Sequence, residues 1–384
     1  MSSACAGSLL TYLSQVPDPR GRKGRRHCLS AILTAVVCGV LCGVRGYEDL
    51  VEWLHGLPVD VWHWMGYTRR PPKKDCFRDL LMAIDPAVLE KVLRAWIETD
   101  LNLDMDVDEL SGVSIDGKTL CATLRVFERA VHLLSMVDHR TGCVLSQCRV
   151  DEKTNEHKAA LPLLKEMVLH GRVVVGDAMF CQRDLCAQIV EAQGDYLVSV
   201  KENQPTLLRE IQLEFHTEPS GGSPYGQRER PADRQTVSTL DKGHGRLERR
   251  TLTSTTSLSG YLDWPGSKQV CRLERERTIS DQKTTEVAYF VTSLSRSQAN
   301  AATLLSLIRD HWGAIENGVH YVRDEAFAED RCTIFRGHAP QNFAAIRNTA
   351  LNLLRRLGLV KVTATLRSFT RNPLRLLSIL GYRN

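Results

Sequence analysis

One short run constrains the fold more than any other part of the sequence: Val173, Val174 and Val175, followed by Gly176 and Asp177. Consecutive β-branched residues favour a β-strand, and a run without polar alternation predicts a strand that is buried on both faces. Such a strand needs other elements packed on both sides, which in a mixed protein are helices. The run therefore predicts an α/β fold with a central strand that ends at an acidic residue.

The segments around this run complete a mixed sheet. Strands are predicted at 113–116, 131–137 and 143–150, and Asp138 to Gly142 forms a hairpin connection between the last two. Helical spacing predicts helices at 157–170 and 183–193 and separates the strands at 173–177 and 196–201. This order of elements is that of the ribonuclease-H-like fold, in which the first and fourth strands are neighbours.

The rest of the chain suggests further parts. Residues 1–100 are predicted to form a helical N-terminal accessory or DNA-binding domain, and residues 101–384 a ribonuclease-H-like catalytic domain. A β-rich insertion is expected at about 216–286, because Ser, Thr, Gly and Arg dominate there and the strand at 286–294 closes it. Two more helices are predicted after the insertion, at 299–323 and 340–357.

The uncharged run from Leu29 to Val44 has 16 residues, fewer than the roughly 20 that a membrane-spanning helix needs. It is therefore predicted to be a buried helix. The 12 cysteines include no C-x-x-C pair, which favours free thiols in a reducing compartment over zinc ligands. Both features predict a cytoplasmic protein with no membrane partner.

Basic residues are concentrated in three places, at 20–26, 69–74 and 228–250, although the formal net charge is only +5. One such cluster is usually a solvated loop, but three in one chain favour contact with phosphates. The segment Lys74 to Arg78 either begins a small helix that faces DNA or is a plain surface turn, and its residues do not decide between the two.

Three acidic residues are candidates for metal-dependent phosphodiester chemistry. Asp116 and Asp177 each end an apolar strand, 177 − 116 = 61 residues apart, and adjacent strands would place both carboxylates side by side. Glu316 lies on the long helix, where its spacing from Trp312, His320 and Arg323 predicts one shared face. Carboxylate oxygens are the ligands that Mg²⁺ prefers, and two such ions offset charge on the entering and leaving oxygens. The alternatives are an Asp that only caps a turn and a Glu that is only solvated.

Several segments in the same order resemble the insertion-sequence DDE transposases of the group that contains the H-repeat-associated proteins. The resemblance covers nearly the whole chain. The segments that carry it are Pro17–Arg20, Arg26–His27, Ile115–Thr119, Val150–Glu156, Gly176–Met179, Asp195–Gln204, His244–Glu248, Trp264–Gly266, His311–Asn317 and Glu329–Arg331.

This resemblance implies a catalytic triad of Asp116, Asp177 and Glu316 that binds two Mg²⁺ (or Mn²⁺) ions per active site. It also implies that the substrates are the terminal inverted repeats of a transposon and the target DNA, both double-stranded. A homodimer on DNA is expected because two ends must be joined, in the nucleoid of a bacterium. Three positions depart from the group: Gly318 and Arg323 where other residues are usual, and Glu202 in place of Gly.

Further residues are predicted to contact DNA through positive charge, amide groups or an aromatic ring that stacks on a base. They are Lys118, Lys201, Asn203, Gln204, His244, Arg246, His311, Trp312, Asn317, His320 and Arg323. The predicted function is metal-dependent cleavage at transposon ends followed by strand transfer. The alternatives are an immobile, domesticated DNA-binding or nicking protein of the same fold, a nuclease that does not join strands, and a structural protein that binds no metal.

Overall fold

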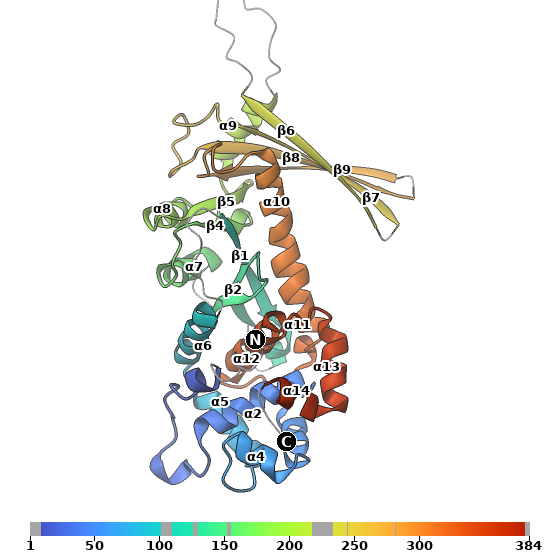
Figure 1. Cartoon of the computed structure of the whole chain (residues 1–384). Helices are drawn as coiled ribbons and strands as arrows, with labels where there is room; N and C mark the ends of the chain where they lie inside the picture. Colours follow the sequence, from blue (N-terminus) through green and yellow to red (C-terminus); the bar gives the residue numbers. More distant parts are fainter. Residues whose placement is uncertain are drawn as a thin grey trace, which may run out of the picture. The chain divides into compact units, whose positions relative to one another are not determined.

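The computed structural model describes residues 9–100, 110–125, 130–151, 155–216, 233–243, 245–280 and 282–380. They form a mixed α/β protein with a helical N-terminal region (Figure 1). The chain divides into two compact units. Unit 1 takes its residues from 1–105, 117–155 and 314–384, and unit 2 from 106–116 and 156–313.

The described strands form one mixed sheet in the order β3-β2-β1-β4-β5-β9-β8-β7-β6. β1 pairs with β4 and β4 with β5 in parallel, whereas the pairs β2–β3, β5–β9, β9–β8, β8–β7 and β7–β6 are antiparallel. The strands are β1 (Ser111–Leu120), β2 (Val131–Asp138), β3 (Val144–Val150), β4 (Arg172–Gly176), β5 (Asp195–Val200), β6 (Arg234–Gly243), β7 (Arg246–Thr255), β8 (Gln269–Ile279) and β9 (Gln282–Thr292).

The core of unit 2 confirms the prediction for the run at residue 173. All five residues of β4 are buried, and Val173 and Val175 belong to a cluster with Leu197 of β5 and Leu304 and Ile308 of helix α10. α10 (Ala301–His311) packs against β4, β6 and β7. Three further helices belong to this unit: α7 (Glu156–Lys165) packs against α8 (Arg183–Glu191), α8 against β5, and α9 (Pro205–His216) against β8 and β9.

The predicted insertion does not form a separate sheet. β6, β7 and β8 lie within residues 216–286 and extend the sheet beyond β9, as long strands that cross one another with a strong twist (Figure 1). The helix predicted at 157–170 ends at Lys165, because the following residues turn into β4, with Gly171 at a φ of 72°.

Unit 1 combines helices from both ends of the chain. α12 packs against α2, α5, α6 and β3, and fifteen of its residues are buried. The N-terminal helices therefore share a core with a C-terminal helix, a different division from segments 1–100 and 101–384. The helices are α2 (Leu29–Leu41), α3 (Tyr47–His55), α4 (Val59–Trp64), α5 (Lys74–Ala83), α6 (Pro86–Asp100), α11 (Tyr321–Glu325), α12 (Ala339–Arg356), α13 (Val362–Arg371) and α14 (Pro373–Ile379).

The uncharged run at residue 29 is a buried helix, as predicted: twelve of the thirteen residues of α2 are buried. Within the described part of the chain, none of the helices combines the length and the apolar character needed to span a membrane. The described cysteines are all free thiols, and seven of them are buried: Cys38, Cys42, Cys143, Cys181, Cys186, Cys271 and Cys332.

Candidate active site

Asp116 and Asp177 occupy equivalent positions on two neighbouring parallel strands of unit 2. Ile115 of β1 and Gly176 of β4 are register partners, and each aspartate is the next residue in its chain. Adjacent strands lie about 4.8 Å apart, so the two aspartates lie side by side where the pairing of β1 with β4 ends. The predicted pairing of the first and fourth strands is therefore confirmed. β4 ends at Gly176 as predicted, whereas β1 continues to Leu120, so Asp116 lies within its strand and not at its end.

Gly176 lies where the pairing of β1 with β4 ends, and a side chain has no room there. A Cβ at this position would lie 3.0 Å from Cδ2 of Phe180 and 3.1 Å from Cγ2 of Ile115. Both neighbours are fully buried, so neither can move aside without opening the core. The glycine thus lets the ring of Phe180 pack directly under the residues that precede both aspartates.

Asp177 caps the short turn η3 (Ala178–Phe180) that follows β4. Its Oδ1 accepts a hydrogen bond from the backbone N–H of Met179 at 2.9 Å. Asp177 is exposed, yet partial desolvation by the surrounding protein raises the pKa of its carboxyl group. The negative charge of Glu156 raises this pKa further, whereas the positive charge of Lys201 lowers it. A bound cation would relieve this destabilisation of the charged carboxylate.

Asn203 and Gln204 brace the same turn. Asn203 Nδ2 donates to the carbonyl oxygen of Ala178 at 2.7 Å, and Gln204 Nε2 donates to that of Cys181 at 3.0 Å. The prediction assigned both amides to DNA. In this structure they instead bond to the backbone around Asp177, because they follow the adjacent strand β5 and reach that loop.

The helix that carries Glu316 differs from the single α-helix predicted at 299–323. α10 ends at His311, a π-helical segment, η4, runs from Trp312 to His320, and α11 follows to Glu325. Buried residues recur at every fourth position: Leu307, His311, Ile315, Val319, Arg323 and Phe327. An α-helix has 3.6 residues per turn, so a strict spacing of four drifts around it. The wider turn of a π-helix reduces that drift, and π-helical turns are frequent at functional sites.

Glu316, Trp312, His320 and Arg323 were predicted to share one face of this helix, and the prediction is wrong for Arg323. Glu316 is exposed and Trp312 and His320 are partly buried, but Arg323 is fully buried. His311 is also buried, at 7% exposure. Its Nδ1 lies 3.0 Å from Oγ of Ser114. This pair ties the end of α10 to β1 within unit 2, so His311 positions the helix and does not present its ring to DNA.

A cluster of arginines surrounds one buried carboxylate on β7 and β8. Glu248 is 2% exposed and forms ion pairs with Arg246, Arg250, Arg275 and Arg277. Burial alone would raise the pKa of Glu248, but the arginines, Arg275 first, hold it below its usual range. The Arg275 guanidinium also lies over the ring of Trp312, 5.1 Å from its centroid. The surface around Trp312 therefore carries surplus positive charge.

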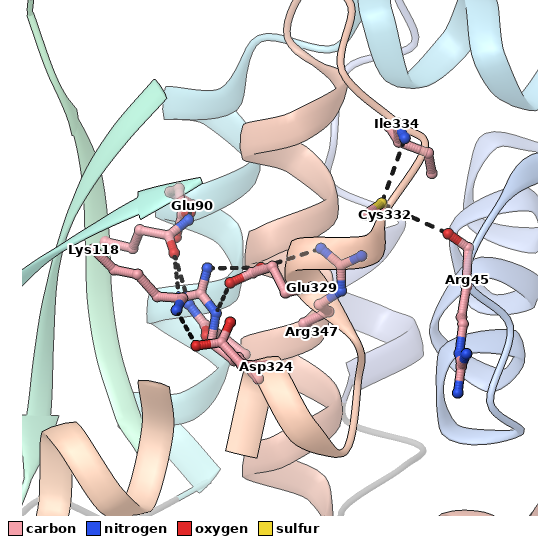
Figure 2. A network of polar contacts seen from close by, with 11 residues as sticks. Arg45, Glu90, Lys118, Asp324, Glu329, Cys332, Ile334 and Arg347 are labelled. Atoms are coloured by element: carbon pink, nitrogen blue, oxygen red, sulfur yellow. Dashed lines mark hydrogen bonds and ion pairs between the residues drawn. The ribbon is translucent and has the colours of Figure 1, made fainter. Parts of the chain in front are cut away.

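Unit 1 contains a second, buried network (Figure 2). Arg323 donates to Glu329 through Nε at 2.8 Å and Nη2 at 2.9 Å, and Arg347 Nη1 donates to the same carboxylate at 3.1 Å. Lys118 Nζ forms an ion pair with Asp324 at 2.6 Å, and its side chain is 9% exposed. The prediction that Arg323 contacts DNA is therefore corrected, because this cation is fully buried against a carboxylate of its own unit. Lys118 is partly buried in its ion pair, and its DNA contact stays a prediction.

His320 lies next to this network. Burial, followed by the charges of Arg323 and Lys118, lowers the pKa of its imidazole to about 3, so the ring is neutral at physiological pH. His320 therefore offers no positive charge to a phosphate.

Burial has the opposite effect on an acid of the same unit. It raises the pKa of Glu90, which accepts a hydrogen bond from Gln147 at 2.7 Å, to about 8.

Four of the predicted DNA-contacting residues, Lys201, Arg246, Asn317 and the partly exposed Trp312, remain accessible, and Glu316 is exposed as well. His244 lies outside the described residues. Sequence reasoning included Glu248 and Glu329 only in segments that resemble the family, and it missed Arg275 and the ion pairs that all three residues form. A signal existed for Glu248 and Arg275, because positions 246, 248 and 250 and positions 275 and 277 alternate along strands and so share a face.

Among the residues that the structure describes, no three or more His, Cys, Asp or Glu side chains are grouped to hold a metal ion. The pair Asp116 and Asp177 nevertheless fits one in its chemistry. Their carboxylates are hard oxygen donors on neighbouring strands, and burial raises the pKa of Asp177, an effect that a bound cation would oppose. Glu316 belongs to the other unit, and its carboxylate is exposed.

The comparisons with known proteins define the class. Residues 109–353 match the family model described as "Transposase DDE domain", and residues 10–97 match the model described as "DDE_Tnp_1-associated". The first match spans more than half of the chain, so this chain belongs to the family of DDE-domain transposases.

Two relatives come from Escherichia coli. The protein named "H repeat-associated putative transposase YhhI", from strain K12, is 29% identical over 356 residues, 90% of each chain. YncI of strain O157:H7 is 29% identical over 354 residues, 91% of this chain and 87% of that protein. A solved structure of the piggyBac transposase synaptic complex with hairpin DNA covers 99% of this chain and 85% of its own, at 12% identity and a TM-score of 0.42.

Proposed function

We propose that this protein cleaves DNA at the ends of a transposon in a metal-dependent reaction and transfers the cut strands into target DNA. The observation that carries the proposal is the placement of Asp116 and Asp177 directly after register partners on two parallel strands. The order β3-β2-β1-β4-β5 supports a ribonuclease-H-like core, with β9 and β8 to β6 added at its edge.

Asp116, Asp177 and Glu316 would hold two Mg²⁺ or Mn²⁺ ions. When bound, such ions activate a water or a 3′-hydroxyl and offset the charge of the entering and leaving oxygens. The chain's own contribution is to fix the ligands. Gly176 lets Phe180 and Ile115 pack closely where the pairing of β1 with β4 ends, and the amides of Asn203 and Gln204 fix the turn after Asp177. The π-helical segment keeps Glu316 exposed while Ile315 and Val319 stay buried.

The DNA would lie on surfaces that carry accessible positive charge. Arg246 is exposed and Arg277 is partly exposed, and together with Arg275 they surround Glu248 with more positive than negative charge. Trp312 offers a ring beside Arg275. Phosphate contacts of this kind supply affinity without sequence preference, whereas an aromatic ring can stack on an exposed base. A homodimer on DNA follows from the reaction itself, since two transposon ends must be joined in one complex.

The direct test is nicking of a duplex that contains the element's end, with Mn²⁺ and with the ion chelated. We expect nicks at the end that require the metal, and no nicks on a shuffled duplex. A target plasmid in the same reaction tests joining: covalent insertion supports a transposase, whereas nicks without insertion identify a nuclease. Sequence-dependent binding without any nick would identify an immobile, domesticated DNA-binding protein and contradict the proposal.

A further inference from the structure

A groove of about 600 Å³ lies in unit 1. Its lining comes from three places: the start of α3, the first half of α5, and the segment after Glu329. The lining residues are Arg45, Gly46, Tyr47, Glu48, Asp49, Lys74, Arg78, Arg331 and Thr333. The sequence alone left open whether Lys74 to Arg78 face DNA, and this groove places both residues in one cavity wall.

Positive charge exceeds negative charge in this lining. Arg45, Lys74, Arg78 and Arg331 give four cations, and Glu48 and Asp49 give two anions, a balance of 4 − 2 = +2. Lys74 pairs with Glu48 at 2.7 Å, and Arg78 pairs with Asp75 and Asp79, each at 2.9 Å. Arg45 and Arg331 are exposed, and neither side chain forms an ion pair with another described residue. Among the lining residues, these two guanidiniums and the Asp49 carboxylate are therefore left outside the ion pairs, which leaves one net positive charge.

The groove also receives the N-terminal ends of two helices. α3 begins after Gly46 and α5 after Lys73, and neither helix has a side-chain cap that accepts its first N–H groups. The positive end of a helix dipole adds to the attraction of an anion. Gly46 also lets the Thr333 hydroxyl approach the start of α3, since a Cβ there would lie 3.2 Å from Oγ1.

The wall that carries Arg331 is held firmly. Arg331 is two residues after Glu329, which is fixed by the buried arginines Arg323 and Arg347. Cys332 Sγ donates to the carbonyl oxygen of Arg45 at 3.6 Å and accepts from the backbone N–H of Ile334 at 3.5 Å (Figure 2). The two unpaired arginines are therefore attached to segments that contact each other directly, which preorganises the groove for a ligand.

We propose that this groove binds consecutive phosphate groups of a DNA duplex, through Arg45 and Arg331, without reading its sequence. This inference rests on the proposed function and adds a DNA contact made by the N-terminal region together with the segment after Glu329. Two arginines on different segments of a groove this large suit a chain of phosphodiesters better than one free phosphate. Guanidinium groups pair with phosphate oxygens in a bidentate geometry, so contact with the DNA backbone is the expected mode.

The test measures DNA affinity of the full chain against salt concentration, with a duplex that contains the element's end and with a shuffled duplex. The variant is R45Q/R331Q, and the matched control is R140Q/R367Q, which removes two exposed arginines of the same unit outside the groove. We expect the groove variant to bind both duplexes more weakly, with a salt slope shallower by about 2, one per lost phosphate contact. The control keeps the wild-type slope.

An unchanged slope in R45Q/R331Q, with wild-type thermal stability, would overturn the groove proposal. The single variant R331Q keeps the test decisive if the double variant unfolds, since it predicts a slope shallower by about 1. Inorganic phosphate at constant ionic strength is the second arm: competition that removes the difference between variant and wild type would assign the groove to free phosphate instead. Nicking by the wild-type protein is scored separately. Its absence, with the slope difference intact, would contradict the proposed function and leave the groove standing.

Discussion

Replacing Glu329 with Gln should destabilise unit 1 severely. The carboxylate is 2% exposed and is the shared acceptor for Arg323 and Arg347, whose side chains are 0% and 3% exposed. The Gln side chain keeps the shape but leaves two buried guanidiniums without their counter-charge. Removing one partner of a buried ion pair costs about 3–5 kcal/mol, and this carboxylate serves two pairs, so we expect a loss at the upper end of that range.

The assay is denaturant unfolding of the full chain, combined with hydrogen exchange that localises the change to peptides of unit 1. The matched control is E325Q, which changes an exposed glutamate four residues earlier and should cost less than 0.5 kcal/mol, roughly the scatter of surface substitutions.

A pH series adds a second check. Arg323 and Arg347 hold the pKa of Glu329 below its usual value although burial opposes them. Its contribution is therefore present above the unfolded value of about 4.3 and is lost as the pH falls through the lower folded value. If E329Q unfolds within 1 kcal/mol of the wild type, a margin of roughly the size of a single neutral hydrogen bond, the network does not stabilise the unit as argued.

Three further predictions concern the acidic strands and the arginine surface. G176A should lose about 1–3 kcal/mol of stability and most of its nicking activity, because the new Cβ would lie too close to Phe180 and Ile115. In the control G243A the new Cβ has no atom within 4 Å, so this variant should match the wild type in both measurements. Burial raises the pKa of Asp177 and the charge of Lys201 lowers it, so the K201M variant should have a higher pKa at Asp177. When the affinity for Mn²⁺ is measured by titration at decreasing pH, it should therefore begin to fall at a higher pH in K201M than in the wild type. An unshifted profile would show that Lys201 does not act on this carboxylate. R275A should weaken binding to both end-containing and shuffled duplexes and reduce the salt slope by about 1, and wild-type affinity in fluorescence anisotropy would remove the β7–β8 surface from the DNA interface.

The sheet was predictable because its signals are local. The β-branched run of β4 and its final aspartate appear directly in the sequence, and the order of strands and helices around it predicts that β1 lies beside β4. The hairpin of β2 and β3 likewise follows from the turn at residues 138–142. Each of these features depends on neighbouring residues and on one rule of strand order.

The parts that could not be predicted depend on contacts between distant residues. Arg323 looked available for DNA until Glu329 and Arg347 were seen to enclose it, and the ion pair of Lys118 with Asp324 likewise joins distant residues. The π-helical segment has a signal, a buried residue at every fourth position from Leu307 to Phe327, but burial is visible only in the folded chain. Helical spacing alone therefore placed Arg323 on the same face as Glu316.

The central claim is that two aspartates and one glutamate hold the catalytic metal ions. Its most direct test compares Mn²⁺-dependent nicking of an end-containing duplex by the wild type, D177N and E316Q, with the exposed residue Glu325 changed in E325Q as the control. We predict that the wild type and E325Q nick the duplex, whereas D177N and E316Q bind it with unchanged affinity and do not nick it. Nicking by E316Q at the wild-type rate would contradict the assignment of Glu316 to the active site.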